Sequence, residues 1–251
     1  MPEYKCPVCE SKSTILDVVD FSKSCEERNG KFLEKTGIPV YYAICDGCDF
    51  AFSPDFRNWS QEEFAEKIYN QEYIEVDPDY LEKRPNHNFN LLNILFGKNK
   101  REIVHLDYGG GNGELVRKLT LSDWLSNNYD PFSTTHSNIG DLRTFNLITA
   151  FEVFEHVPDP NEIMKNLKIL IEEYGLILFS TLVSDSNIKR NERLSWWYAS
   201  PRNGHVSLFT YKSLRILGEK YDLNFASLGI GTHIYYKNFP KWANSLISSS
   251  S

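Results

Sequence analysis

The fold is decided by the stretch Ile103-Val104-His105-Leu106-Asp107-Tyr108-Gly109-Gly110-Gly111-Asn112-Gly113-Glu114-Leu115-Val116. A short apolar run ends at an acidic residue, and three glycines then recur at every second position, at Gly109, Gly111 and Gly113. Apolar residues return at helical spacing from Leu115 onward. The pattern predicts a strand, a glycine-rich turn and the start of a helix in unbroken succession.

Glycines in such a turn let the main chain approach a ligand, because any Cβ would hold the backbone away or forbid a positive φ. The free N–H groups at the helix start would then face the bound molecule. No Gly-Lys-Ser/Thr follows, which excludes a Walker-type phosphate loop. Asp-x-Gly-x-Gly-x-Gly resembles the first motif of class I S-adenosylmethionine-dependent methyltransferases more closely than the Gly-x-Gly-x-x-Gly dinucleotide fingerprint. The resemblance implies that Asp107, Gly109, Gly111 and Gly113 contact S-adenosylmethionine; the alternative is a plain strand-to-helix turn.

A second strand is predicted from Trp124 to Tyr129, and it ends at Asp130. In nucleoside-binding α/β domains an acidic residue at this tip accepts hydrogen bonds from the two ribose hydroxyls. We therefore expect Asp130 to hold the cofactor ribose, the alternative being a turn-forming aspartate before a proline. Residues 132–144 are too few for a helix and a third strand, so a surface loop is predicted there. Asp141 in this segment could meet the adenine amino group.

Residues 145–151 read as a buried parallel strand, followed directly by Glu152-Val153-Phe154-Glu155-His156-Val157-Pro158-Asp159-Pro160. Glu-Val-x-Glu-His-Val-x-Asp-Pro resembles class I methyltransferases typified by ubiquinone-biosynthesis O-methyltransferases and by sugar-modifying methyltransferases. The resemblance covers about residues 101–240. It implies an α/β fold with a Rossmann-like, mostly parallel sheet closed by an antiparallel C-terminal hairpin.

The same resemblance places Phe151 and Glu152 beside the cofactor, since open α/β sheets bind ligands at the carboxyl ends of their strands. It also implies that Glu152, Glu155 and His156 could hold a divalent cation. Capping of the following helix by these side chains is the competing interpretation.

Further along, the segment from Pro201 to Thr210 contains His-Val-x-x-Phe-Thr, which begins at His205. It resembles zinc-bearing sugar C-methyltransferases, in which the matching histidine serves as base. Those enzymes carry a tyrosine or a His-Glu pair before that histidine, whereas this chain has Asn203 and Gly204, so the substrate does not carry over. A histidine near its unperturbed pKa of about 6.5 can take a proton at neutral pH, and we expect His205 as the base, with His156 as second choice.

Four of the five cysteines fall in two Cys-x2-Cys pairs, Cys6 with Cys9 and Cys45 with Cys48. Two such pairs complete a tetrahedral zinc site, which is structural because four thiolates leave no position for water or substrate. The 35 residues between the pairs exceed what a compact zinc ribbon needs, so a strand or hairpin must loop out. The alternative is unconnected reduced thiols. Cys25 stands apart in a polar segment and is expected to be an incidental thiol.

The chain of 251 residues is predicted to hold a zinc-binding module (1–56), a helical linker or lid (57–100) and a methyltransferase domain (101–247). Ser60 is a plausible N-cap for the linker. Tyr69 and Tyr73 could close over the cofactor, although packing between modules explains them equally well. Trp196 and Trp197, in a polar insertion, could shape an acceptor pocket or pack internally.

The formal net charge is −7, which disfavours nucleic acid as a partner. No apolar run long enough for a membrane span and no signal-peptide core are present, so we expect a cytoplasmic protein with no membrane partner. The expected function is O-methylation of a small-molecule acceptor, such as a nucleotide-activated sugar or a capsule or lipopolysaccharide precursor. Alternatives are a sugar C- or N-methyltransferase, an rRNA or tRNA methyltransferase whose zinc module grips RNA, and a cofactor-binding module without catalysis. The oligomeric state is left open.

Overall fold

The computed structural model describes residues 3–131 and 139–248. The chain forms two compact units that are interleaved in sequence. Unit 1 contains the residues up to Pro78 together with Phe154–Ile163 and Thr181–Leu217, and unit 2 contains Asp79–Val153, Met164–Ser180 and the residues from Gly218 onward. These limits differ from the predicted boundaries at residues 56 and 100, and each unit is described by itself below.

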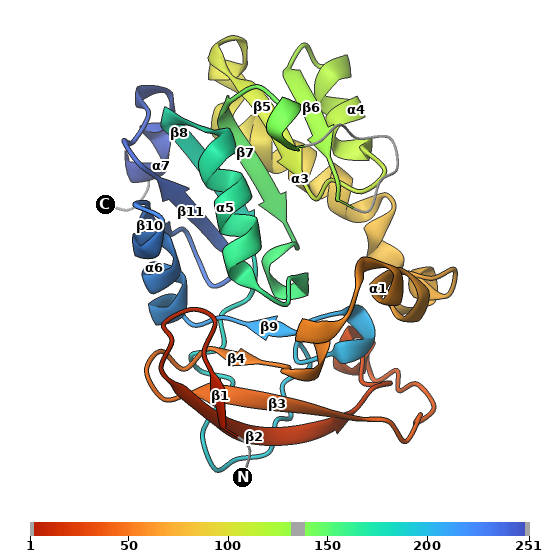
Figure 1. Ribbon diagram of the computed structural model, residues 1–251. Helices are drawn as coiled ribbons and strands as arrows, with labels where there is room; N and C mark the ends of the chain where they lie inside the picture. The colour runs from red at the N-terminus through yellow and green to blue at the C-terminus, as the bar shows by residue number, and fades with distance from the viewer. Residues whose placement is uncertain (1–2, 132–138, 249–251) are drawn as a thin grey trace. The chain divides into compact units, whose positions relative to one another are not determined.

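Unit 2 is built on a sheet with the strand order β10-β11-β8-β7-β5-β6 (Figure 1). The strands are β5 (Val104–Tyr108), β6 (Leu125–Tyr129), β7 (Phe145–Phe151), β8 (Ile171–Ser180), β10 (Asn224–Ser227) and β11 (Thr232–Tyr236). β5 to β8 run parallel, whereas β10 and β11 form an antiparallel hairpin that pairs with β8. The predicted fold class, a mostly parallel sheet closed by an antiparallel hairpin, is therefore confirmed.

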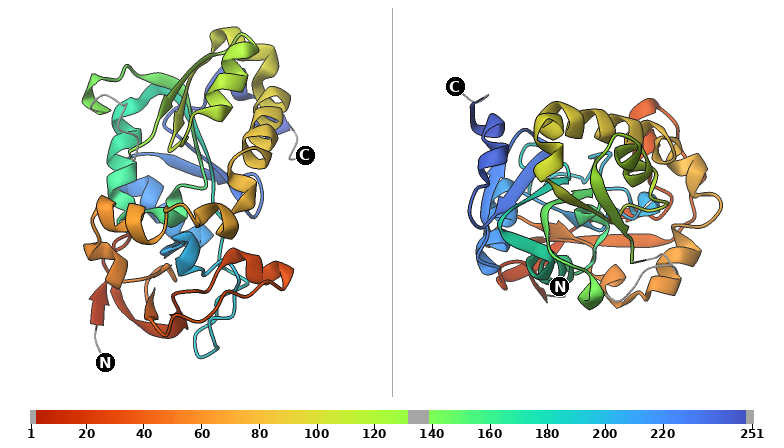
Figure 2. Two further views of the ribbon diagram at one scale, coloured as in Figure 1. Left: turned by 90° about the vertical axis from the view of Figure 1, so that its right-hand side faces the viewer. Right: turned by 90° about the horizontal axis from the view of Figure 1, so that it is seen from above.

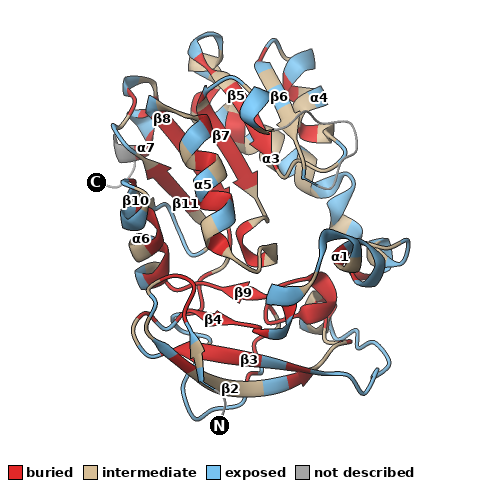
Figure 3. Ribbon diagram, in the orientation of Figure 1, coloured by how far each residue is buried: buried red, intermediate tan, exposed pale blue. Residues whose placement is uncertain are grey.

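Helices cover both faces of this sheet (Figure 2). α3 (Lys83–Phe96) and α4 (Glu114–Leu121) lie on one face, and α5 (Pro160–Leu170) lies on the other. β5 and β7 are largely buried, as Figure 3 shows, and most of their residues are apolar, as expected for strands covered on both faces; the polar residues His105, Asp107 and Thr149 are buried within them. Leu92, Leu119, Leu147 and Leu178 belong to the resulting core. The smaller elements are η3 (Pro78–Tyr80), η4 (Gly97–Glu102), η5 (Ile139–Asp141), η8 (Lys241–Ala243) and α7 (Ser245–Ser248).

Between β6 and β7, the described residues hold only the short turn η5, which contains Asp141. The predicted surface loop falls largely on residues 132–138, which lie outside the described residues. The sheet of unit 2 therefore passes from β6 to β7 with no strand among the described residues of this connection.

Unit 1 is built on an antiparallel sheet with the order β1-β2-β3-β4-β9. Its strands are β1 (Glu3–Lys5), β2 (Lys12–Asp20), β3 (Pro39–Cys45), β4 (Ala51–Phe52) and β9 (Ser207–Leu208). β4 pairs with β9, so the sheet that carries the cysteines takes its last strand from a segment more than 150 residues away, beside His205. The cysteine pairs and the His205 segment thus belong to one compact unit.

The helices of unit 1 are short: α1 (Gln61–Lys67), α2 (Tyr73–Val76) and the first turns of α6 (Tyr211–Lys220), with the 3-10 turns η1 (Cys25–Asn29), η2 (Asp55–Asn58), η6 (Phe154–His156) and η7 (Pro201–Asn203). Ser60 caps α1 in a reciprocal capping box with Glu63, as its sequence predicts. Trp196 is buried in the apolar core of the unit and Trp197 packs against that core, which favours internal packing for both indoles. No helix in the part of the chain that the structure describes has the length and apolar character of a membrane span.

Candidate functional site

The glycine-rich turn follows β5 and leads into α4 within unit 2. Gly109, Gly111 and Gly113 have φ values of 75°, 53° and 76°, in the left-handed region that disfavours side chains. A Cβ on Gly109 would also lie 2.6 Å from Val153 Cγ2. These positions require glycine for the reason that the sequence pattern predicts.

Asp130 lies at the tip of β6 beside this turn. Its Oδ2 accepts a hydrogen bond of 2.8 Å from the N–H of Gly111, and Asn128 Nδ2 donates to the carbonyl oxygen of Gly111 at 3.2 Å. A Cβ on Gly110 would lie 2.0 Å from Asn128 Oδ1 and 2.5 Å from Asp107 Oδ2. Sequence reasoning singled out the alternate glycines and missed Gly110, whose requirement comes from side chains on two neighbouring strands.

A buried relay of hydrogen bonds ends at Asp107. Ser126 Oγ lies 2.7 Å from His105 Nδ1, and His105 Nε2 lies 2.9 Å from Thr149 Oγ1. Thr149 donates its hydroxyl to Asp107 Oδ1 at 2.6 Å. Since the threonine proton is used on Asp107, His105 must donate from Nε2 and accept from Ser126 at Nδ1. Each donor in the relay is thereby oriented toward the carboxyl group.

Burial raises the pKa of Asp107 to about 7, and the neighbouring Asp130 adds to the rise, while the Thr149 hydrogen bond opposes it. Because an unfolded aspartate titrates near 3.9, the contribution of Asp107 to stability is present below about pH 4 and is lost as the pH rises to about 7. Burial lowers the pKa of His105 to about 3, so its contribution has the opposite sign: it is present above about pH 6.5 and is lost as the pH falls.

An Asp107→Asn variant should isolate the first of these two effects, because asparagine keeps the shape and removes the titration. We expect its unfolding free energy, relative to the native chain, to rise by about 1.4 kcal/mol per pH unit between about pH 4 and 7. Urea unfolding of both proteins without ligand at several pH values in this range measures the difference. A difference that stays constant with pH would contradict the assignment.

The end of β7 carries Phe151 and Glu152, both half-buried. Glu152 has a φ of 54°, an unusual conformation for a residue with a long side chain. Ser180, at the end of β8, accepts the Glu152 N–H at 2.8 Å and donates its hydroxyl to Glu152 Oε1 at the same distance. Two strand ends thus hold the Glu152 carboxylate in place, and Phe151 packs against the core of unit 2.

The two predicted histidines lie together in unit 1. The ring centroids of His156 and His205 are 4.8 Å apart, and Glu155 is fully buried beside them. η6 carries Glu155 and His156, and its backbone is joined to the segment after His205 by the bond from Val206 N–H to Glu155 O, at 2.9 Å. Gly204, with a φ of 84°, leaves room for His156, because a Cβ there would lie 3.1 Å from His156 Nδ1.

Tyr198 contacts both Glu155 and His205, and sequence reasoning missed it. Its carbonyl oxygen lies 2.9 Å from His205 Nδ1 and can only accept, so Nδ1 carries the proton and Nε2 keeps the lone pair. Its hydroxyl donates to Glu155 Oε1. Cys25, expected to be incidental, lies with Sγ 3.7 Å from His205 Nδ1 and 3.0 Å from Ser200 Oγ. No spacing in the sequence could bring these residues together.

Among the described residues, Glu155, His156 and His205 form a group whose ligand atoms lie within 4.8 Å of one another. One carboxylate and two imidazoles are a donor set that suits divalent transition metals. Of the predicted cation ligands, Glu155 and His156 belong to this group, and Glu152 does not. His205 takes the third place.

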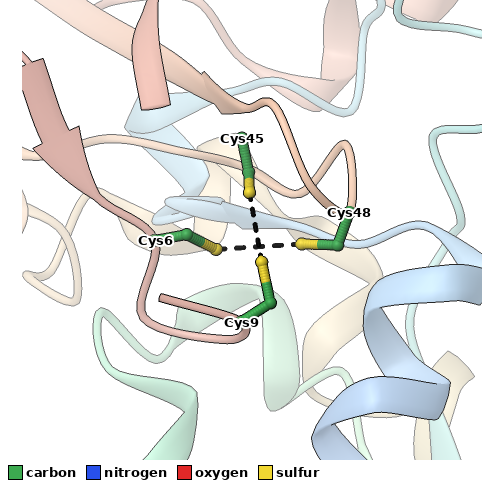
Figure 4. A group of neighbouring side chains, drawn as sticks. All are labelled: Cys6, Cys9, Cys45 and Cys48. Carbon is green, nitrogen blue, oxygen red and sulfur yellow. Dashed lines mark hydrogen bonds between the residues drawn. The ribbon is translucent and has the colours of Figure 1, made fainter. Parts of the chain in front are cut away.

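The four paired cysteines of unit 1 point their sulfur atoms at one another (Figure 4). Cys6 Sγ lies 3.8 Å from Cys48 Sγ, and Cys9 Sγ lies 3.3 Å from Cys45 Sγ, with all four thiols free of disulfides. A tetrahedral zinc with Zn–S bonds of about 2.3 Å separates its sulfurs by about 3.8 Å, so the cluster fits this ion. The hydrogen bond between Cys6 and Cys48 lowers the pKa of the Cys6 thiol and raises the pKa of the Cys48 thiol, so it favours the thiolate at only one of the two sulfurs.

Comparison with known proteins identifies the family of the chain. A family model described as a methyltransferase domain matches residues 80–228, more than half of the chain. The ubiquinone biosynthesis O-methyltransferase of Pasteurella multocida (strain Pm70) is 30% identical over 134 residues, which are 53% of this chain and 40% of that protein. The protein with the same name from Glaesserella parasuis serovar 5 is 46% identical over 89 residues, 36% of this chain and 31% of that one. The chain therefore spans less than half the length of these relatives.

Two solved structures show weaker similarity. An O-methyltransferase family protein from Burkholderia thailandensis is 11% identical, with a TM-score of 0.48 over 72% of this chain and 64% of that one. Magnesium protoporphyrin IX methyltransferase from Synechocystis PCC 6803, solved with bound SAH, is also 11% identical, with a TM-score of 0.44 over 72% of this chain and 95% of that one. The family model matches residues 80–228, which include the glycine-rich turn, His156 and His205. The chain therefore belongs to the methyltransferase domain family.

Proposed function

We propose that the chain is an S-adenosylmethionine-dependent O-methyltransferase that acts on a small polar acceptor. Membership of the family supports methyl transfer, and the ubiquinone biosynthesis O-methyltransferases among the relatives support oxygen as the accepting atom. The observation that carries the cofactor assignment is the side-chain-free turn at residues 109–113, whose Gly111 N–H holds the Asp130 carboxylate. The same carboxylate is suited to the two ribose hydroxyls of the cofactor.

Two acceptor classes follow from different observations. A nucleotide-activated sugar or a capsule or lipopolysaccharide precursor follows from the likeness of the His205 segment to sugar methyltransferases. An intermediate of ubiquinone biosynthesis follows from the names of the relatives. Incubation of the protein with methyl-labelled cofactor and each class of compound, with product detection by mass spectrometry, separates the two. Transfer to neither class, despite cofactor binding, would favour a binding module without catalysis.

An Asp130→Asn variant is expected to bind S-adenosylmethionine about 10- to 100-fold more weakly, because hydrogen bonds to a charged group contribute about 1.5–3 kcal/mol. Asp123→Asn is the matched control, since Asp123 lies in the same unit with an exposed side chain and a φ of 60° that asparagine also tolerates. Isothermal titration calorimetry measures both affinities. Equal affinity of the Asp130 variant and the native chain would remove Asp130 from the cofactor site.

In the proposed reaction, the acceptor oxygen forms a bond to the methyl carbon while the bond from that carbon to the sulfonium sulfur breaks. The acceptor hydroxyl must also lose its proton. His205 is the proposed base, because its Nδ1–H donates to the Tyr198 carbonyl and Nε2 is then the ring nitrogen that can take the acceptor proton. The protein's remaining task is to align the reactants and exclude water.

The group of Glu155, His156 and His205 is also proposed as a divalent cation site. A cation held there would act as a Lewis acid on the acceptor oxygen and favour its deprotonated form. His205 cannot serve as ligand and base through the same nitrogen, so the two roles are alternatives. The four-cysteine cluster is proposed to hold a structural zinc ion, which would stabilise unit 1 without taking part in the chemistry.

The rival in another substrate class is an RNA methyltransferase whose cysteine module grips RNA. The net charge of −7 argues against it. Filter binding of structured RNA at several salt concentrations tests this rival, since binding by phosphate contacts would weaken steeply with added salt.

A further inference from the structure

Unit 1 contains a pocket of about 270 Å³ that no step of the proposed reaction uses. Its walls come from the loop after β2, from the segment after α1, and from η7. Two cations, Arg202 and Lys67, and two carboxylates, Glu34 and Glu72, line it together with the hydroxyls of Ser22 and Thr36. These charged groups differ in their exposure to water, because Arg202 is buried whereas Glu34 and Glu72 are exposed. This difference determines which ligand the pocket favours.

Arg202 is a buried cation, with a side chain that is 10% exposed. Its Nη1 donates to Ile68 O at 3.0 Å and its Nη2 donates to Asn70 Oδ1 at 3.3 Å, both neutral acceptors. These bonds occupy two of the five N–H groups of the guanidinium. Burial lowers the pKa of Arg202, which reflects the cost of keeping its charge away from water.

The carboxylates around the pocket compensate this charge poorly. Glu72 Oε2 is 3.9 Å from Arg202 Nη2, and its side chain is 79% exposed. Glu34 is exposed as well. Charges in water interact weakly, whereas a desolvated cation exerts a strong field over the same distance. The buried guanidinium therefore dominates the electrostatics of the pocket. Lys67, at the end of α1, adds a second positive charge to the lining, with its Nζ 3.2 Å from Glu63 Oε1.

Arg202 and His205 belong to one hydrogen-bonded segment of the chain. The 3-10 turn η7 closes with the Gly204 N–H bonded to Pro201 O at 2.9 Å, and His205 N–H is bonded to Ser200 O at 3.1 Å. Asn203 Oδ1 accepts the Cys25 N–H at 2.8 Å, which ties the same turn to η1. A ligand group bound at Arg202 would thus be positioned with respect to the imidazole of His205 within unit 1.

We propose that this pocket binds a phosphate or carboxylate group and that the methyl acceptor carries this group. The planar guanidinium offers paired N–H donors that match two oxygens of such an anion, and Lys67 adds a point charge. The anion site stands on the geometry alone, whereas its assignment to the acceptor rests on the proposed methyl transfer. The acceptor is then an anionic metabolite, with its methylated hydroxyl distinct from its anionic end.

Titration of the full-length protein with inorganic phosphate, by calorimetry at low ionic strength, tests the anion site. Lys67→Met is expected to weaken phosphate binding about threefold to fivefold, and Glu72→Gln to strengthen it by a similar factor, as expected for single exposed charges. Lys5→Met is the matched control, because Lys5 is an exposed lysine of the same unit that does not line the pocket. Arg202→Lys keeps the charge and loses the paired donors, and its thermal unfolding reports whether the bond to Ile68 is needed for folding.

The anion site would be overturned if the native chain did not bind phosphate, or if the Lys67 and Glu72 variants bound phosphate with the same affinity as each other. The acceptor assignment is tested separately with an active acceptor. Lys67→Met should raise the acceptor KM and Glu72→Gln should lower it, with kcat and cofactor affinity unchanged. Phosphate binding that responds to both variants while the acceptor KM does not would support the pocket and overturn the acceptor assignment. Phosphate binding without methylation of any compound would locate the failure in the proposed function instead.

Discussion

A Cys45→Ser variant is expected to lose the zinc ion proposed for unit 1 and at least about 4 kcal/mol of unfolding free energy, a loss typical of a structural metal site. Cys45 ends β3, the strand in the middle of the unit 1 sheet, and its sulfur is fully buried against Cys9. Removing one thiolate leaves three cysteines, Cys6, Cys9 and Cys48, which cannot complete the tetrahedron. Zinc content by elemental analysis and urea unfolding measure the two losses.

Cys25→Ser is the matched control for zinc content, because Cys25 lies outside the four-cysteine group. It should retain one zinc per chain. A native chain purified without zinc, or a Cys45 variant that keeps its full zinc content and stability, would contradict the structural metal. Because Cys25 contacts Ser200 and His205, the Cys25→Ser variant controls for zinc content and not for catalytic activity.

A His205→Asn variant is expected to lower kcat about 10²- to 10⁴-fold, the range attributed to a positioned general base. Cofactor affinity should stay near the native value, because a general base acts on the acceptor hydroxyl and not on the cofactor. Steady-state kinetics with labelled cofactor, together with calorimetry for binding, measures both. His87→Asn is the matched control, since His87 is an exposed histidine of α3.

Full turnover by the His205 variant would show that His205 is not the base, and His156 would be the next candidate for that role. The cation alternative is separated by the same assay with and without added divalent metal. Activity of the native chain that depends on Mg²⁺ or Mn²⁺, and that is lost equally in Glu155→Gln and His205→Asn, would assign His205 as a ligand. Activity that is indifferent to these ions would leave it as the base.

Much of unit 2 is predictable because its signals are local in sequence. Residues 145–151 form β7 at the predicted limits, since a mostly apolar run of seven residues between Thr144 and Glu152 matches a strand covered on both faces. The glycine-rich turn, the helix after it and the C-terminal hairpin follow from equally local patterns. Gly110 shows the limit of this reasoning, because its constraint comes from Asn128 and Asp107.

Unit 1 resists prediction because its contacts are distant in sequence. Ser207 and Leu208 are only two residues of strand, and nothing in their identity indicates pairing with Phe52 and Ala51. The contact of Cys25 with His205 and the hydrogen bond from Tyr198 to Glu155 also join residues that are distant in sequence, so no local pattern predicts them. The two cysteine pairs were recognisable since Cys-x2-Cys carries its own chemical meaning at short range.

The pairing of β4 with β9 also has a consequence for how the protein is made. The last cysteine of the two pairs is Cys48, but the strand that completes their sheet is made only with residues 207 and 208, about 160 residues later. Chains are synthesised from the N-terminus at about 5–20 residues per second, so a nascent chain waits on the order of ten seconds between the two events. During this interval β4 is an open edge of the sheet, and its length of only two residues limits pairing with neighbouring polypeptides.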